Sequence, residues 1–314
     1  MTSAPKFAIA IAAAAALTSS QAQGQQPKAP PPITAKSVYV LNAETGQVLY
    51  RKGDGKPVRL HSLTKLITAD ILVQRFGDRL TETVTIAPKH LTTGASAGLR
   101  AGDVGSLEAL LAGLLLVSGN DTALAIADHA GRAILAEAGK KGDATKRFVS
   151  EMGPAAASLG AASAKFADPH GISPANTATA ADVAMIGARV FRDKRLLAFW
   201  RCSQRSVALG GPAARTVTLN STVEILGEDR ILGAKTGSHF GQGIFNLVAG
   251  WQAPNGQTIV AVVLGSSDNA ARYRDMRAIL AALPQDFPAL AEPTGGPWTA
   301  GPCPEPLPPL PSRP

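Results

Sequence analysis

The pattern of apolar residues predicts strands near both ends of the chain. The strand-forming runs are rich in Val, Ile and Leu and cover 37–41, 47–50, 231–236, 244–251 and 258–264. Polar residues 42–46 separate the first two runs, and Asn255-Gly256 separates the last two. Each of these pairs therefore predicts an antiparallel hairpin.

Helices are predicted for the middle of the chain, where apolar residues recur every three to four positions. One apolar stripe runs from Leu63 to Phe76, with Ser62 near its start. A second stripe follows Ser106, a typical N-cap residue, and a capping box at Thr179–Asp182 opens a third. With these two included, the helical stretches predicted after the first are 107–115, 122–130, 144–159, 179–191 and 270–283.

The order of these elements is two strands, a long helical middle, three strands and a final helix. This order predicts an α/β fold of the α+β type. Both ends of the chain then contribute strands to one antiparallel five-stranded sheet, and the helices flank its faces. The sequence contains no internal repeats that would suggest another architecture.

The two ends differ in composition from the middle. Lys6, the apolar run Phe7–Leu17 and the small residues around Ala22 predict a secretory signal over 1–22, cleaved after Ala22, with an uncleaved anchor as the alternative. An apolar run of about eleven residues is too short to span a bilayer, which takes roughly 20. Residues 23–35 are rich in Pro and Gln and predict an extended lead-in, 36–283 predict one domain, and 284–314 predict a disordered Pro- and Gly-rich tail. We therefore expect an exported protein of the periplasm or another extracytoplasmic part of the cell envelope, with no membrane anchor in its tail.

Charge and cysteine content narrow the possible partners. The formal net charge of +8 suits a polyanionic neighbour such as the bacterial envelope, but no Lys- or Arg-rich run with interleaved aromatic residues predicts nucleic-acid binding. Cys202 and Cys303 either form one disulfide or remain apart, and the sequence leaves both readings open. The five histidines are scattered, so we expect neither a metal site nor a cofactor.

Three short motifs follow one another at wide intervals: Ser62 with Lys65 three positions later, Ser118-Gly119-Asn120, and Lys235-Thr236-Gly237. Each motif alone is weak, because each is common at helix caps, turns or strand ends. Residues three apart on a helix are neighbours, so Lys65 lies beside Ser62. A serine becomes a nucleophile when a base takes its proton, and a lysine can be that base only where its surroundings keep it partly neutral.

Together the three motifs form a known set, with a nucleophilic serine on a helix, Ser-x-Asn on a turn between helices and Lys-Thr-Gly on a strand. The similarity extends over 62–69, 115–121, 168–172, 233–237 and 246–249. On these residues the chain, from about 36 to 283, resembles the low-molecular-mass penicillin-binding proteins, the D-alanyl-D-alanine carboxypeptidase family. The resemblance implies the penicillin-binding, serine β-lactamase-like transpeptidase fold.

The resemblance also implies a mechanism. Ser62 is then the nucleophile, Lys65 the general base, Ser118 a proton shuttle, and Asn120 a group that orients Lys65 and the substrate amide. Burial and the nearby charge of Lys235 are expected to lower the pKa of Lys65. The expected partners are peptidoglycan stem peptides ending in D-Ala-D-Ala as substrates and β-lactam antibiotics as covalent inhibitors.

Substrate binding is expected on the last strands and the final helix. Lys235 and Thr236 lie beside the substrate, and Gly237 allows its backbone to approach the strand closely. Arg272, seven residues after Gly265, matches the family position that binds the terminal carboxylate. The alternative for Arg272 is a solvated arginine at a helix start.

The sequence departs from the family pattern at several places. His61 stands before the nucleophile where Ala is usual, and Ser238-His239 follows Lys-Thr-Gly where a Thr is usual at the second position. Gly153-Pro154 falls within a helix that is continuous in relatives, so we expect a kink or a restart there. The role of His61 is left open, and His239 either contacts substrate or covers the pocket rim.

Three other functions compete with a carboxypeptidase. A class A β-lactamase needs Glu in a Glu-x-x-Leu-Asn stretch, and Glu137, Glu151, Glu224 and Glu228 all have other neighbours. A penicilloyl enzyme should therefore be long-lived. A DD-endopeptidase that cuts peptidoglycan crosslinks uses the same motifs and remains open. A non-catalytic murein-binding protein is disfavoured by the intact motif residues.

Overall fold

The computed structural model describes residues 32–200, 202–284 and 287. The predicted signal peptide, most of the predicted lead-in and nearly all of the predicted tail lie outside the described residues. Cys303, whose pairing with the buried Cys202 the sequence leaves open, lies outside them too. Among the described residues, no helix has the length and apolar character needed to cross a bilayer.

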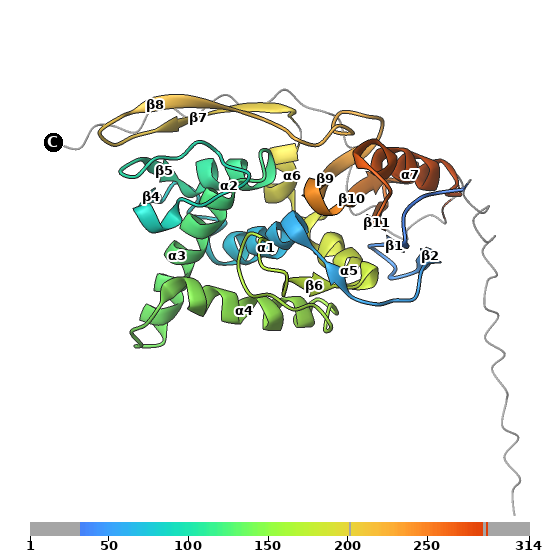
Figure 1. The fold of residues 1–314 in the computed structure, drawn as a ribbon, viewed down its shortest axis with the longest axis horizontal. Coiled ribbons are helices and arrows are strands. Elements are labelled where there is room, and N and C mark those ends of the chain that lie inside the picture. The colour runs from blue at the N-terminus through green and yellow to red at the C-terminus, as the bar shows by residue number, and fades with distance from the viewer. Residues whose placement is uncertain (1–31, 201, 285–286, 288–314) are drawn as a thin grey trace, which may run out of the picture.

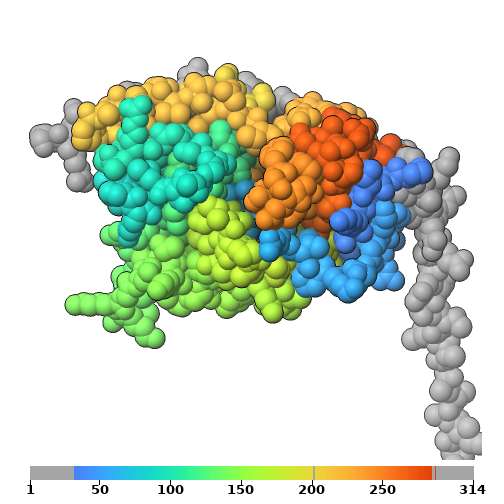
Figure 2. Space-filling view, viewed as in Figure 1, coloured from blue at the N-terminus to red at the C-terminus, as the bar shows by residue number. Residues whose placement is uncertain are grey.

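The predicted five-stranded antiparallel sheet is confirmed, and both ends of the chain contribute to it (Figure 1). Its strands are β1 (Ser37–Asn42), β2 (Val48–Lys52), β9 (Ile231–His239), β10 (Ile244–Gln252) and β11 (Thr258–Leu264). Their order is β2-β1-β11-β10-β9, with Ser37 opposite Leu264 where the first strand meets the last. The surface view shows the early and late segments side by side (Figure 2).

The sheet separates two apolar cores because successive side chains of a strand point to opposite faces. From β11, Ala261 and Val263 join the core under α7 (Asn269–Ala281), whereas Val260 and Val262 join the larger helical core. On that second face α5 (Ala180–Val190) packs against β1, β10 and β11. Both faces of the sheet are therefore covered, which explains the almost unbroken apolar sequence of its central strands.

The helical part consists of α1 (Lys65–Phe76), α2 (Leu107–Leu115), α3 (Asn120–Glu137), α4 (Ala144–Ser158) and α6 (Lys194–Trp200). The predicted caps are confirmed: the Ser106 hydroxyl accepts a hydrogen bond from Ala109 N at 3.1 Å, and Thr179 and Asp182 form a capping box. The expected helix over 62–76 is corrected at its start, since Ser62 lies on a 3₁₀ turn, η1 (His61–Thr64), directly before α1.

Of the kink or restart expected at Gly153-Pro154, the restart is corrected, because α4 continues through both residues. Pro154 lacks the N–H that would bond to the carbonyl four residues earlier, that of Ser150. Both Pro154 and Ser150 are exposed, so water can satisfy that carbonyl at little cost.

Three small two-stranded sheets were not predicted. They pair β3 (Val58–Arg59) with β6 (Thr177–Ala178), β4 (Thr83–Thr85) with β5 (Val104–Ser106), and β7 (Gln204–Leu209) with β8 (Arg215–Asn220). The β7–β8 hairpin runs along the top of the molecule in Figure 1, above α2 and β5. Arg215 fixes it there through an ion pair to the buried Asp103, with Nη1 and Oδ1 2.7 Å apart.

Candidate active site

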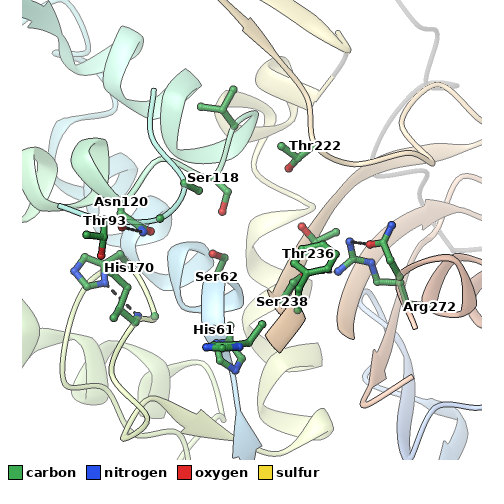
Figure 3. Close-up of a pocket in the computed structure, with 18 residues that line it drawn as sticks. His61, Ser62, Thr93, Ser118, Asn120, His170, Thr222, Thr236, Ser238 and Arg272 are labelled. Atoms are coloured by element: carbon green, nitrogen blue, oxygen red, sulfur yellow. Dashed lines mark hydrogen bonds between the residues drawn. The ribbon is translucent and has the colours of Figure 1, made fainter. Parts of the chain in front are cut away.

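The three sequence motifs meet at one cavity of about 630 Å³. Ser62 comes from η1, Ser118 from the turn between α2 and α3, Asn120 from the start of α3, and Thr236 from β9 (Figure 3). Lys65 and Lys235 are fully buried directly behind Ser62 and Ser118. The cavity also includes Thr93, Gly94, Ala95, Val117, His170, Gly171, Ile172, Thr222, Ser238, His239, Phe240, Asn269, Arg272 and His61.

Lys65 is held against Ser62 by two oxygen acceptors. Its Nζ atom donates to Asn120 Oδ1 and to the backbone oxygen of His170, both at 2.7 Å, and lies 3.1 Å from Ser62 Oγ. Since two N–H bonds point at those oxygens, the remaining valence of Nζ points at the serine hydroxyl. In a neutral amine this valence is the lone pair that accepts the proton of Ser62.

Burial lowers the pKa of Lys65 to about 7, although the carboxylates of Asp168 and Asp121 act to raise it. Burial likewise lowers the pKa of Lys235 well below its ordinary value, and repulsion from Lys65 and Arg272 lowers it further. Of the two causes expected to lower the pKa of Lys65, burial is confirmed and the charge of Lys235 is corrected, since repulsion between the two lysines lowers the pKa of Lys235 instead. Lys65 thus has a substantial neutral fraction near neutral pH.

The second lysine pairs with the second serine. Lys235 Nζ donates to Ser118 Oγ at 2.8 Å and to the backbone oxygen of Thr236 at 3.1 Å. Ser118 adopts a left-handed backbone conformation with φ of 60°. Figure 3 shows its hydroxyl and that of Ser62 directed into the same space. A proton can therefore pass between a group bound at Ser62 and the Ser118–Lys235 pair.

A tight loop supplies the His170 carbonyl that holds Lys65. Asp168 organises this loop by accepting backbone N–H groups of His170, Gly171 and Ser173. Burial alone would raise the pKa of Asp168, but the hydrogen bond from His170 and those backbone N–H groups outweigh it and hold that pKa well below its usual range. The sequence motif at 168–172 was recognised, yet the carbonyl was missed, because a backbone oxygen leaves no residue-type signal.

Gly237 packs against η1, the 3₁₀ turn that carries Ser62. A Cβ at this position would lie 2.3 Å from the backbone oxygen of Leu60, so the glycine lets β9 pack tightly against η1. This contact gives Gly237 a packing reason beyond the expected approach of substrate. Because β9 is the last strand of the sheet, its second edge is available beside the cavity.

Arg272 reaches from α7 toward β9 and is buried, so it is not the solvated arginine that was the alternative (Figure 3). Its guanidinium donates to neutral oxygens, those of Ser238 and Asn269 among them, and its Nε atom has no partner. No carboxylate among the described residues lies within ion-pairing distance of it. A buried cation with neutral partners is suited to an anionic ligand. Ser238 was not foreseen as its neighbour.

Comparisons with known proteins agree on one family. A family model described as D-alanyl-D-alanine carboxypeptidase matches residues 23–268. The chain is 28% identical over 260 residues to a Streptomyces D-alanyl-D-alanine carboxypeptidase, an alignment that covers 80% of this chain and 87% of the relative. It is 28% identical over 277 residues to D-alanyl-D-alanine carboxypeptidase DacD of Escherichia coli, covering 82% of this chain but 65% of that longer relative.

Solved structures show the same fold. The crystal structure of a Streptomyces DD-transpeptidase matches with a TM-score of 0.73 at 27% identity, over 81% of this chain and 98% of that chain. Penicillin binding protein 6B from Escherichia coli shares the fold, with a TM-score of 0.68 at 24% identity, over 82% of this chain and 79% of that chain.

Proposed function

Since the chain belongs to the D-alanyl-D-alanine carboxypeptidase family, we propose that it is a serine peptidase of the bacterial envelope that removes D-alanine from peptidoglycan stem peptides. The observation that carries the proposal is the setting of Lys65. A buried amine with a pKa of about 7 lies 3.1 Å from a serine hydroxyl, held there by two fixed oxygens. This arrangement is what a serine nucleophile with a lysine base requires.

In the acylation step Ser62 Oγ attacks the carbonyl carbon between the two alanines while Lys65 takes its proton. The backbone N–H groups of Ser62 and Ser238 stabilise the oxyanion, and one such donor is typically worth roughly 10²–10³ in rate. The C–N bond then breaks as the leaving amine takes a proton from Ser118, Lys65 returns the proton it had accepted to Ser118, and D-alanine departs. In the second step water attacks the Ser62 ester while the now neutral Lys65 accepts its proton. The ester C–O bond then breaks, and Lys65 gives that proton to Ser62 Oγ.

Substrate binding uses the free edge of β9. The donor peptide lies along this edge as an added strand, with Asn120 beside its amide. The terminal carboxylate binds at Thr236 and Arg272, with Ser238 holding the guanidinium in place. Because β-lactams acylate the same serine in this family, penicillin should form a covalent adduct with Ser62.

The test is covalent labelling with a fluorescent penicillin followed by peptide mapping. Wild-type protein should carry one label on Ser62, and Ser62→Ala should carry none. Ser206→Ala, on the exposed side of the β7–β8 hairpin, is the matched control and should label as wild type does. Absence of label on the wild type, or equal labelling of Ser62→Ala, would refute the mechanism.

Purified muropeptides then identify the reaction. Release of D-alanine from uncrosslinked peptides supports the carboxypeptidase, whereas conversion of dimers to monomers supports an endopeptidase. The structural likeness to a DD-transpeptidase gives a third outcome, in which an added amine acceptor is joined to the donor peptide. Each of the three rates is divided by the amount of protein that penicillin labels at Ser62. The fastest of the three normalised reactions identifies the activity.

A further inference from the structure

Asn176 is a buried polar residue that lies between the loop carrying the His170 carbonyl and β6. Its side chain is 0% exposed, and it follows Thr64 in the sequence by 112 positions. The residues that line the active-site cavity do not include Asn176, so it has no contact with a substrate bound there. Any effect of Asn176 on catalysis must therefore act through the residues that its side chain holds.

The side-chain amide of Asn176 holds the start of this loop. Its Oδ1 atom accepts the backbone N–H groups of Ala167 at 2.7 Å and of Asp168 at 3.3 Å. Its Nδ2 atom donates to the backbone oxygen of Asp168 at 3.1 Å and to Oδ1 of the Asp168 carboxylate at 3.0 Å. Since Asp168 organises the rest of the loop, the amide fixes the orientation of the group on which the loop depends.

The same residue also holds η1, the turn that carries Ser62. Its Nδ2 atom donates to Thr64 Oγ1 at 3.1 Å, and Thr64 is the last residue of η1, directly before Lys65. The backbone oxygen of Asn176 accepts the N–H group of Leu60, the residue directly before η1, at 3.0 Å. Asn176 is therefore bonded to the chain on both sides of Ser62.

These contacts fix both ends of the Lys65 side chain. A lysine has a flexible stem of four carbons, so the place of its amine depends on its backbone position and on the acceptors that hold Nζ. The bond to Thr64 fixes the backbone next to Lys65. The Asp168 carboxylate accepts the N–H group of His170 at 3.0 Å, and the His170 carbonyl accepts Lys65 Nζ at 2.7 Å. Because Asn176 contacts both Thr64 and Asp168, it sets the position of that carbonyl relative to the turn.

Asparagine is the residue type whose side chain fits this site. The surroundings present two N–H groups to Oδ1 and three oxygens to Nδ2, and the amide of asparagine supplies an acceptor and two donors. An aspartate would direct a second carboxylate at Asp168, and an aliphatic residue would leave buried polar groups unpaired. The amide therefore joins two segments that neither a charged nor an apolar side chain could join.

We propose that Asn176 is a positioning residue for the reaction, which holds the Lys65 amine against the Ser62 hydroxyl by bonding the loop to η1. This inference rests on the proposed function, because it takes Lys65 as the base. Thr236 and Arg272, which bind the carboxylate in that function, lie on β9 and α7 and are not among the hydrogen-bond partners of Asn176. Loss of the Asn176 amide should therefore slow acylation and leave the binding of the ligand unchanged.

The experiment measures penicillin acylation at increasing antibiotic concentration, which separates the limiting acylation rate from the concentration that gives half of it. Asn176→Ala should lower the limiting rate at least about tenfold and leave the half-saturating concentration within about twofold of wild type, because catalysis is sensitive to small displacements of its groups. Thr64→Val removes the acceptor on η1 and leaves the loop contacts of Asn176 in place. It should also lower the limiting rate about tenfold, and Thr64→Ser, which keeps the hydroxyl, should restore it to within about threefold of wild type.

Two comparisons separate positioning from a general loss of stability. The double variant Thr64→Val/Asn176→Ala should acylate as slowly as Asn176→Ala alone, because both changes remove the same hydrogen bond. Asn42→Ala is the matched control, since Asn42 is 2% exposed, donates to Gln257 at 2.8 Å and does not line the cavity. It should lower the thermal midpoint as Asn176→Ala does, because each variant leaves buried polar groups unpaired, but it should keep the wild-type limiting rate.

Limiting rates within about twofold of wild type in both Asn176→Ala and Thr64→Val would overturn the proposal. Rate losses that multiply in the double variant, or an equal loss in Asn42→Ala, would overturn it too. If Asn176→Ala does not fold, Thr64→Val decides alone, and a normal limiting rate in that variant overturns the proposal. Absence of label on the wild-type protein would instead overturn the proposed function, whatever the variants show.

Discussion

Lys65 combines complete burial with two neutral oxygen partners. Burial favours the uncharged form of its amine, and the carboxylates of Asp168 and Asp121 act the other way. The neutral amine can act as a base because its free valence points at Ser62. The burial that makes this lysine costly to accommodate therefore also prepares it as a base.

The pKa of Lys65 predicts the pH dependence of acylation. The folded-state pKa of about 7 is below the ordinary lysine value, so the neutral, proton-accepting form grows as pH rises through 7. The second-order rate of penicillin acylation should rise about tenfold per pH unit below pH 6 and level off above pH 8. Stopped-flow measurement of a chromogenic β-lactam checks this. A rate that is flat from pH 5 to 8 would contradict Lys65 as the base.

Lys65→Met separates the chemical role of the lysine from its structural role. Acylation should fall by about 10²–10⁴, the usual contribution of a general base. The thermal midpoint should stay the same or rise, because methionine fills similar space without a buried amine. Differential scanning fluorimetry and penicillin labelling of the same preparation test both parts. Labelling at the wild-type rate would remove Lys65 from the mechanism.

Elements differed in how far the sequence predicted them. Four strands of the main sheet, β1, β9, β10 and β11, were predicted because both of their faces are buried and their apolar runs are almost continuous. β2 is mostly exposed and was predicted from its short strand-forming run after the polar turn. β7 and β8 were missed. Val217 and Leu219 alternate with polar residues in β8, but Ala208 between Val207 and Leu209 weakens the alternation in β7. The short strands β3, β6, β4 and β5 pair with partners that are distant in the sequence. Each has only two or three residues, which is too few to show an alternation of apolar and polar positions.

At the element scale, Gly171 controls the position of η1. Its φ is +95°, and a Cβ there would lie 1.9 Å from the backbone oxygen of His61. Gly171→Ala should therefore displace the turn that carries Ser62 and reduce acylation at least tenfold, by the sensitivity of catalysis to misplacement. Gly227→Ala is the control, since its φ of +91° imposes the same backbone strain with no atom within 4 Å. Both variants should lose about 1 kcal/mol of stability from that strain, but Gly227→Ala should acylate normally. Equal acylation rates would show that the contact at Gly171 does not matter.

The loop around Asp168 predicts an acid-sensitive contribution to stability. Its folded-state pKa is below the unfolded value, so the stabilisation is present above about pH 4 and is lost as pH falls further. Asp168→Asn should lower the thermal midpoint at pH 7, and the difference from wild type should shrink below pH 4. Melting curves from pH 7 to 3 check this. A difference that stays constant with pH would show that the charge of Asp168 is not what stabilises the loop.

At the scale of the whole molecule, Asp275 ties the beginning of the described chain to its final helix. Its carboxylate accepts the backbone N–H groups of Thr34 and Ala35 and the hydroxyls of Thr34 and Ser266. Asp275→Ala leaves these donors unsatisfied, so it should cost about 2–4 kcal/mol of unfolding free energy. Asp229→Ala, whose carboxylate is 90% exposed, should cost almost nothing. Urea unfolding followed by circular dichroism measures both. Similar midpoints for the two variants would contradict the role of Asp275.

The sequence predicted which side chains make up the candidate site, but it did not predict the contacts that hold them in position. Ser62, Lys65, Ser118, Asn120 and Lys235 have residue types that the chemistry demands, so the sequence shows them. The His170 carbonyl, the packing of Gly237 on Leu60 and the closeness of Ser238 to Arg272 follow from tertiary contacts between distant segments. Such contacts have no local pattern that would reveal them.

The pairing of β1 with β11 also determines when the active site can form during synthesis. β1 is synthesised early, whereas its partner β11 and the strands β9 and β10 are synthesised almost last. Pairing across such a sequence separation is slow, because the long intervening chain must first be drawn together. A growing chain thus carries its serine and lysine long before β9 and α7 exist to complete the cavity. Activity begins only when the last strands arrive, so an unfinished chain has no means to react with substrate or antibiotic.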